Sequence, residues 1–164
     1  MTRIARDLPE SVTETYPAVA ASLFNGRRVV TELAVAAGAT RDQVDAIRLA
    51  TSEALTNVIV HAYGERSGDI YLTAAVAGGE LWLLVADDGD GLHQRGGKSG
   101  LGLGLTLIAQ ACDELTIVKR STAGTELRMR FRLGTGADAS AAAHPRGSVA
   151  SASWPASSVF STTK

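Results

Sequence analysis

The segment Glu53-Ala-Leu-Thr-Asn57-Val-Ile-Val-His61 combines an apolar stripe with three polar residues at a spacing of four. The stripe repeats at the helical period over a longer stretch, so the sequence predicts a helix from Arg41 to about Ala62 with Thr40 as its N-cap. The spacing of four places the polar side chains on one helical face, beside the stripe. The expected inward positions of this helix are Val44, Ile47, Ala54, Leu55 and Val58.

Helices and strands are expected on both sides of this segment. A first helix, Ser22 to Ala37, is expected to end at Gly38 and to bury Leu23, Val29, Val30, Leu33 and Ala37. A third helix is expected from Leu103 to Cys112. Four strands are expected at Asp69 to Val76, Leu81 to Ala86, Leu115 to Arg120 and Thr125 to Leu133, with a hairpin at Gly78-Gly79. This order predicts an α/β (α+β) two-layer sandwich, with helices on one face of a mainly antiparallel mixed sheet.

Glu53 and Asn57 are suited to share one hydrated divalent cation. The carboxamide oxygen of Asn57 is a hard ligand that suits Mg²⁺, and the carboxylate of Glu53 is then free to accept a proton. The same pattern also fits a plain solvated helix face. His61 fits a capping or packing role at the helix end.

The acidic run Asp87-Asp88-Gly89-Asp90-Gly91 directly follows a predicted strand. A carboxylate there could accept a hydrogen bond from an adenine amino group, with the glycines allowing the base close to the backbone. As an alternative, glycines and aspartates of this kind form an ordinary turn. A calcium loop is disfavoured, because the twelfth position counted from Asp87 is Lys98 and not a bidentate glutamate.

The run Gly100-Leu101-Gly102-Leu103-Gly104 opens the third predicted helix. Exposed backbone amides at a helix N-terminus, with no side chains in the way, form a phosphate site. The run is not a Walker A loop, because no Gly-Lys-Ser/Thr follows, and it lacks the preceding strand of a dinucleotide fingerprint.

Together these segments resemble the N, G1 and G2 boxes of the GHKL ATP-binding superfamily (gyrase, heat-shock chaperone, histidine kinase, mismatch-repair ATPase), and Gly124-Thr125 resembles its fourth element. The resemblance covers Arg41 to Phe131. Between Ile47 and Tyr63 the sequence is most similar to the anti-sigma factor serine/threonine kinases. The short segment Leu92 to Ser99 resembles their ATP lid.

The resemblance implies a Bergerat-type ATP-binding fold with ATP and Mg²⁺ as ligands. It implies that Glu53 is a general base and that Asn57 binds Mg²⁺ and nucleotide. It further implies that Asp87 reads adenine and that Thr125 supports the adenine end. The other nucleotide-binding positions expected from the boxes are Gly89, Gly91, Gly100, Leu101, Gly102, Leu103 and Gly104.

The function that the resemblance implies is an anti-sigma factor with serine/threonine kinase activity. Its partners would be a sigma factor and an anti-sigma factor antagonist, which it would phosphorylate. The alternative is a nucleotide-gated binding module without phosphoryl transfer, which has no need of a base at Glu53. A histidine kinase is disfavoured, because His61, His93 and His144 do not lie where a phosphoacceptor would. A DNA-gating ATPase would need a further transducer domain.

Composition and charge narrow the possible partners and the cellular compartment. The net charge of -1 argues against direct nucleic-acid binding, and no apolar run approaches the roughly 18 residues of a membrane span. The single cysteine, Cys112, fits a reducing cytoplasm, and its apolar stretch predicts a small buried hydrophobic residue and not a nucleophile. We therefore expect a cytoplasmic protein without a membrane partner. The sequence leaves the oligomeric state open, and a homodimer is one state that it allows.

Two parts of the chain differ in composition. Residues 1–133 are expected to form the folded ATPase-like kinase domain. Residues 134–164 are rich in Ala, Ser, Gly and Thr and have no apolar period, so they are expected to form a flexible tail. Trp154 and Phe160 are its exceptions, with docking on the domain or on a partner as the alternative.

Overall fold

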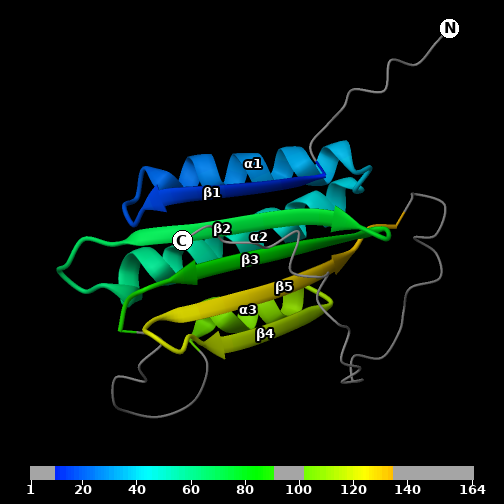
Figure 1. The fold of residues 1–164 in the computed structure, drawn as a ribbon. Helices are drawn as coiled ribbons and strands as arrows, with labels where there is room; N and C mark the ends of the chain where they lie inside the picture. The colour runs from blue at the N-terminus through cyan, green and yellow to red at the C-terminus, as the bar shows by residue number, and fades with distance from the viewer. Residues whose placement is uncertain (1–9, 91–101, 135–164) are drawn as a thin grey trace, which may run out of the picture.

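The computed structural model describes residues 10–90 and 102–134, which form a sheet covered by helices on one face (Figure 1). Within these residues, no helix combines the length and apolar character that a membrane crossing requires. In chain order the elements are β1 (Ser11–Pro17), α1 (Ser22–Ala36), α2 (Arg41–Asn57), the π-helical turn η1 (Val58–Ala62), β2 (Asp69–Ala77), β3 (Glu80–Asp87), α3 (Leu103–Ala111), β4 (Glu114–Lys119) and β5 (Thr125–Arg132).

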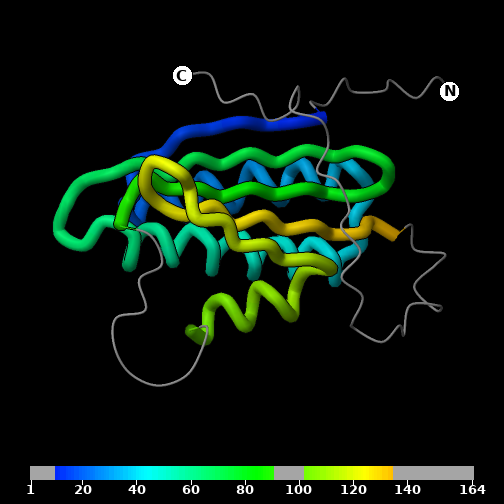
Figure 2. Tube along the Cα trace, turned by 60° about the horizontal axis from the view of Figure 1, so that its bottom comes forward, coloured from blue at the N-terminus to red at the C-terminus, as the bar shows by residue number. Residues whose placement is uncertain are grey.

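The sheet has the strand order β1-β2-β3-β5-β4, and every pairing between the described strands is antiparallel. The helices lie together on one side of it, which the turned view makes plain (Figure 2). The predicted two-layer α/β sandwich is thus confirmed, with a sheet that is antiparallel throughout its described part. The edge strand β1 was not predicted, because the sequence before the first helix has no clear alternation.

Alternating side chains of the sheet face the helices and form the core. In β2, β3 and β5 these positions are almost fully buried, whereas the intervening side chains point to the other face. Burial of each large aliphatic side chain contributes roughly 1.5–3 kcal/mol. The core-facing residues of these three strands are Ile70, Leu72, Ala74, Leu81, Leu83, Val85, Leu127, Met129 and Phe131.

The helix α2 begins with a capping box, in which the Thr40 hydroxyl accepts a hydrogen bond from the Gln43 N–H and the Gln43 side chain accepts one from the Thr40 N–H. All five predicted inward residues of α2 and η1 are buried.

Helix α1 packs closely on α2, and a Cβ atom at Gly26 would lie 2.8 Å from Leu55 Cδ1. In α1 the prediction was wrong at Ala37, which is exposed, while Ala34 is fully buried. The helix ends at Ala36, just before the predicted stop at Gly38, whose φ of +85° favours glycine.

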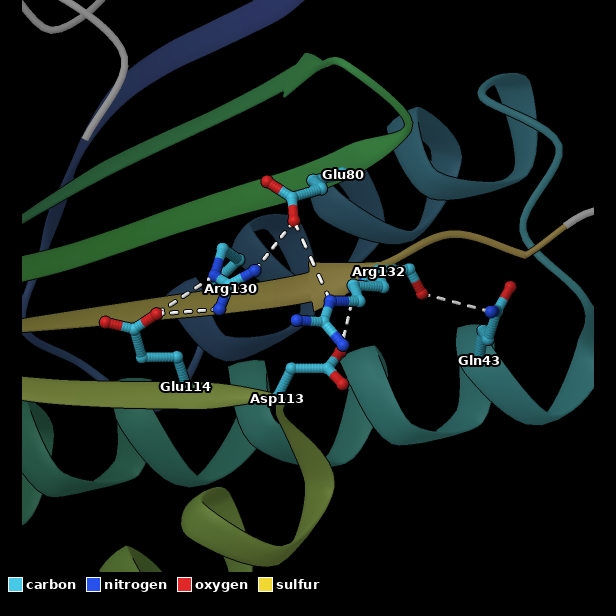
Figure 3. A network of polar contacts seen from close by, with 6 residues as sticks. All are labelled: Gln43, Glu80, Asp113, Glu114, Arg130 and Arg132. Atoms are coloured by element: carbon cyan, nitrogen blue, oxygen red, sulfur yellow. Dashed lines mark hydrogen bonds and ion pairs between the residues drawn. The ribbon is translucent and has the colours of Figure 1, made fainter. Parts of the chain in front are cut away.

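A network of charged side chains joins three strands near the β2–β3 hairpin (Figure 3). Arg130 on β5 donates to Glu80 on β3 at 2.7 Å and to Glu114 on β4 at 2.8 and 3.0 Å. The Gln43 amide of α2 donates to the Arg132 carbonyl oxygen at 3.1 Å, which ties the helix layer to the same corner. Each nitrogen of the Arg130 guanidinium therefore donates to a carboxylate, which indicates a structural role for the network.

Candidate functional site

The end of the second helix departs from the predicted regular α-helix. Its last turn, Val58–Ala62, is π-helical, a form that is often found at functional sites. The Ala62 carbonyl oxygen accepts a hydrogen bond from the Asp90 N–H at 2.8 Å. A Cβ atom at Gly89 would lie 2.0 Å from the same oxygen, so only glycine lets the loop after β3 lie this close to the helix end.

Asp87 ends β3 with a side chain that is 5% exposed. Its carboxylate accepts a hydrogen bond from the Gly89 N–H at 2.9 Å and another from the Thr125 backbone. Burial raises the pKa of Asp87, and the two backbone hydrogen bonds and the nearby Arg120 charge oppose that rise. The structure therefore holds a desolvated carboxylate by backbone amides.

Gly124 and Thr125 border Asp87 at the start of β5. Gly124 has a φ of +89°, and a Cβ atom there would lie 1.9 Å from the Asp87 carbonyl oxygen. Thr125 is 6% exposed. A hollow with an apolar floor adjoins these residues and is lined by Asn57, Val58, His61, Ala62, Val85, Asp87, Thr125 and Leu127. The predicted N box, the acidic run and the fourth element thus meet in one place.

The start of α3 lies against the polar face of α2. A Cβ atom at Gly104 would lie 2.9 Å from Glu53 Oε2 and 3.3 Å from Asn57 Oδ1. Gly102 is the N-cap residue of α3, and no side chain caps the helix there. This helix end, which no side chain caps, therefore lies beside a carboxylate and a carboxamide, and it carries the positive pole of the helix dipole.

Asn57 is the residue best placed to meet a ligand. Its amide Nδ2 is buried and has no hydrogen-bond partner among the described residues. A buried N–H donor of this kind calls for an acceptor, and a phosphate oxygen of a bound nucleotide would supply one. The described residues contain no cluster of three or more His, Cys, Asp or Glu side chains that could hold a metal. Mg²⁺ does not need such a cluster, since it keeps waters and phosphate oxygens as ligands, so the donor set fits it.

Some predicted site residues are not tested by this geometry. Gly91, Gly100, Leu101 and the lid segment Leu92 to Ser99 lie outside the described residues. Leu103 is 77% exposed, so its contribution to a site would come from its backbone.

Two tyrosines and an arginine, Tyr63, Tyr71 and Arg120, contact the acidic run at the end of β3, and no sequence motif indicated a role for them. The Tyr63 hydroxyl donates to the Asp69 carbonyl oxygen at 2.6 Å and accepts from the Asp88 N–H at 2.9 Å. It thereby links the end of the helical segment to the residue after Asp87. The one sequence signal for this contact is that Tyr63 ends the stretch, Ile47 to Tyr63, that resembles the anti-sigma factor kinases.

Arg120 holds the same strand end from the other side. It donates to the Asp87 carbonyl oxygen at 3.0 Å and also binds the Asp88 carboxylate. The Tyr71 hydroxyl donates to the second oxygen of Asp88 at 2.7 Å, and this hydrogen bond raises the pKa of Tyr71 to about 12. Asp88 is thus occupied by the protein itself, which leaves Asp87 as the carboxylate able to meet a ligand.

His61 and Cys112 are the two remaining residues for which the sequence predicted an environment. His61 is exposed and lines the hollow, so it does not pack at the helix end as the sequence suggested. Cys112 is partly buried against the core, and burial raises the pKa of its thiol to about 11. A thiol with so high a pKa is a poor nucleophile.

Comparison with known families agrees with this geometry. A family model described as "Histidine kinase-like ATPase domain" matches residues 16–131, which include every described residue of the site.

Curated relatives extend the agreement. An anti-sigma F factor of Thermoanaerobacter sp. (strain X514) is 29% identical over 120 residues, covering 66% of this chain and 84% of the relative. The serine-protein kinase RsbW of Staphylococcus aureus (strain MRSA252) is 32% identical over 102 residues, covering 52% of this chain and 64% of the relative.

One solved structure is similar along most of the chain. It contains the RsbU and RsbW domains of Rv1364c from Mycobacterium tuberculosis and matches with a TM-score of 0.60 at 25% identity. The match covers 75% of this chain but 32% of the mycobacterial one, so this chain spans about a third of that protein's length.

Proposed function

Because the chain belongs to the histidine kinase-like ATPase domain family, we propose that it is an anti-sigma factor that also acts as a serine/threonine protein kinase. It transfers the γ-phosphoryl group of ATP to a hydroxyl of an anti-sigma factor antagonist and binds a sigma factor on another surface. The family relationship implies nucleotide binding. The similarity to an anti-sigma factor and to a serine-protein kinase supports the finer assignment.

The observation that carries the proposal is the approach of Gly104 to Glu53 and Asn57. It brings the amides at the start of α3 to the two side chains that the chemistry requires. These amides bind the phosphates, and Asn57 holds the metal by its carboxamide oxygen. The metal supplies charge neutralisation on the phosphate oxygens when it is bound.

Asp87 orients the nucleotide at the other end of the site. Its buried carboxylate accepts a hydrogen bond from the amino group at C6 of adenine, while Gly89 and Gly124 keep the strand end in place. Guanine carries an oxygen at C6 and cannot donate there, so the same contact selects ATP over GTP.

Glu53 acts on the protein substrate. It accepts the proton of the serine or threonine hydroxyl as that oxygen bonds to the γ-phosphorus and the bond to the β–γ bridging oxygen breaks, releasing ADP. Catalysis then rests on alignment and on this proton transfer.

Glu53→Gln tests the assignment, because it keeps the size and hydrogen-bonding capacity of the side chain but removes the proton acceptor. We expect transfer from labelled ATP to antagonist proteins encoded near this gene to fall by about a hundredfold or more, with ATP affinity retained. Asn57→Ala is the matched variant on the same helix face and should weaken Mg-nucleotide binding itself.

Two results would count against the kinase. Unchanged transfer by Glu53→Gln would remove Glu53 as the base. Nucleotide binding by the wild-type protein, with no transfer to any antagonist tried, would favour the nucleotide-gated binding module.

A further inference from the structure

The face of the sheet opposite the helices carries buried apolar side chains that do not belong to the core. Trp82 is 5% exposed, Ala75 2% and Ala86 3%, yet none of them is part of the core cluster between the sheet and the helices. They occupy the alternate positions of β2 and β3, which point away from the helices. No described helix or strand covers this face, which is turned toward the reader in Figure 1.

The two side chains directly opposite Trp82 cover only part of its ring. Its cross-strand neighbours are Ala75 on β2 and Arg130 on β5. Alanine is too small to cover an indole ring, and the Arg130 guanidinium lies 5.7 Å from the ring centre, on one side of it. A tryptophan on an open sheet face would keep much of its large surface in water, so a further segment has to lie over it.

The chain outside the described residues can supply that segment. The described chain ends at Gly134 beside the β2–β3 hairpin, because the Leu133 N–H donates to the Gly79 carbonyl oxygen at 2.8 Å, three residues before Trp82 in the chain. Thirty extended residues reach about 100 Å, several times the length of a strand. They carry Trp154 and Phe160, the large aromatic side chains that an apolar sheet face accommodates.

The other two undescribed segments fit this role less well. Residues 91–101 begin after Asp90, at the end of β3 far from the β2–β3 hairpin. The first described residue, Glu10, does lie at the hairpin end, since the Val76 N–H donates to its carbonyl oxygen at 2.8 Å. Residues 1–9 make up a short segment, however, and carry no aromatic residue, with Met1, Ile4 and Leu8 as their large apolar side chains.

We propose that the C-terminal segment 135–164 folds back over the open face of the sheet and covers Trp82 with Trp154 and Phe160. Its composition predicts flexibility as a whole, and the two aromatic residues anchor it to this face. The segment thereby shields an apolar strip that would otherwise favour association with other chains. This role is independent of nucleotide binding and of phosphoryl transfer.

The two tryptophans of the chain, Trp82 and Trp154, make the proposal directly measurable. In full-length Trp154→Phe, Trp82 is the sole tryptophan and the aromatic ring at 154 is kept. We expect Trp82 to emit at short wavelength there and to be poorly quenched by acrylamide. In full-length Trp154→Ala/Phe160→Ala, we expect its emission to move to longer wavelength, its quenching to rise and the melting temperature to fall.

Ile4→Ala/Leu8→Ala in the Trp154→Phe background is the matched control, since it removes two large apolar side chains from the other terminal segment. We expect it to leave the emission of Trp82 unchanged. A complementary variant, Trp82→Phe, leaves Trp154 as the sole reporter, and we expect short-wavelength emission from it. Circular dichroism and a cooperative melting transition establish that each variant is folded.

Three results would overturn the proposal. Long-wavelength emission of Trp82 in Trp154→Phe would mean that the face is uncovered. A shift with the N-terminal pair and none with the C-terminal pair would assign the cover to residues 1–9. Emission that depends on protein concentration, together with dimer formation in sedimentation, would assign it to a second copy of the chain.

Discussion

Strand β3 carries a carboxylate at each end, and the two are held in opposite ways. Glu80 at its start is bound by the Arg130 guanidinium, which also binds Glu114. Asp87 at its end is more deeply buried, and backbone amides of Gly89 and Thr125 hold it. The guanidinium near Asp87, that of Arg120, binds the backbone oxygen of Asp87 and the neighbouring Asp88.

This difference indicates a structural role for the charge of Glu80 and a ligand-binding role for the charge of Asp87. The charge of Glu80 is neutralised by the Arg130 guanidinium, which donates one hydrogen bond to it at 2.7 Å. A carboxylate has about four lone-pair sites, so one held by two backbone amides keeps capacity for a ligand N–H. The comparison predicts that changes at the Asp87 end act on nucleotide binding and changes at the Glu80 end act on stability.

The largest effect is expected at Asp87. Asp87→Ala removes the acceptor for the adenine amino group, and a hydrogen bond to a charged group contributes about 1.5–3 kcal/mol, so ATP affinity should fall roughly 10- to 150-fold. Discrimination against GTP should fall with it, while the melting temperature stays in the wild-type range. Titration calorimetry with both nucleotides measures this. If GTP competes with ATP equally well in the wild-type protein, Asp87 does not read adenine.

Two glycines with similar φ allow the stability cost of backbone strain to be measured apart from the cost of close packing at the Asp87 end of β3. Gly124 (φ +89°) touches the Asp87 carbonyl, whereas Gly38 (φ +85°) has open space around its Cβ position. Gly38→Ala should cost roughly 1–2 kcal/mol of stability from the left-handed conformation alone. Gly124→Ala should cost about 1–3 kcal/mol more, and it alone should weaken ATP binding. Equal losses in chemical denaturation would mean that the close approach to Asp87 has no energetic role.

At the opposite end of β3, Arg130→Met should lower stability by about 1–3 kcal/mol. It leaves Glu80 and Glu114 without their shared cation, and the cost stays below that of a fully buried pair because both carboxylates are partly exposed. ATP affinity should not change. Arg28→Met, which breaks an exposed pair with Glu32, is the control and should have little effect. A clear loss of ATP affinity in Arg130→Met would contradict the proposed division between the two ends.

The smallest effect concerns pH. The folded pKa of Asp87 is raised by burial, so the folded state binds its proton more readily than the unfolded state does. The contribution of Asp87 to stability therefore falls as pH rises from the unfolded value of 3.8 through the folded pKa. Asp87→Asn should accordingly gain stability relative to wild type at neutral pH, and the gain should shrink at acid pH. Melting temperatures of both proteins across that range provide the measurement, and a gain that grows toward acid pH would contradict the burial effect.

Much of the fold was predictable because its signals are local. The capping pair Thr40 and Gln43, the helix stop at Gly38 and the hairpin at Gly78-Gly79 each depend on residues that are neighbours in the chain. The strand β1 escaped prediction, since an edge strand with mostly exposed side chains has no strong alternation. Its position is fixed by pairing with β2, sixty residues away.

The candidate site was predictable in its main residues but not in their supports. Glu53, Asn57, Asp87 and Gly104 stand in recognisable motifs, and the structure brings them to one end of the fold. Their functional roles remain predictions. Arg120 carries no motif at all, because its contacts with Asp87 and Asp88 span more than thirty residues and arise only when the β4–β5 turn meets the end of β3.

The sequence by itself determined the elements, their order and the chemistry of the motifs, because periodicity, caps and glycine runs are properties of neighbouring residues. The tertiary structure alone decided which carboxylate is free to bind. Asp87 and Asp88 are adjacent and chemically identical, yet the strand alternation sends one into the hollow and the other toward Tyr71 and Arg120. Burial and the partners brought by distant strands set that difference, and neither is encoded in the local pattern.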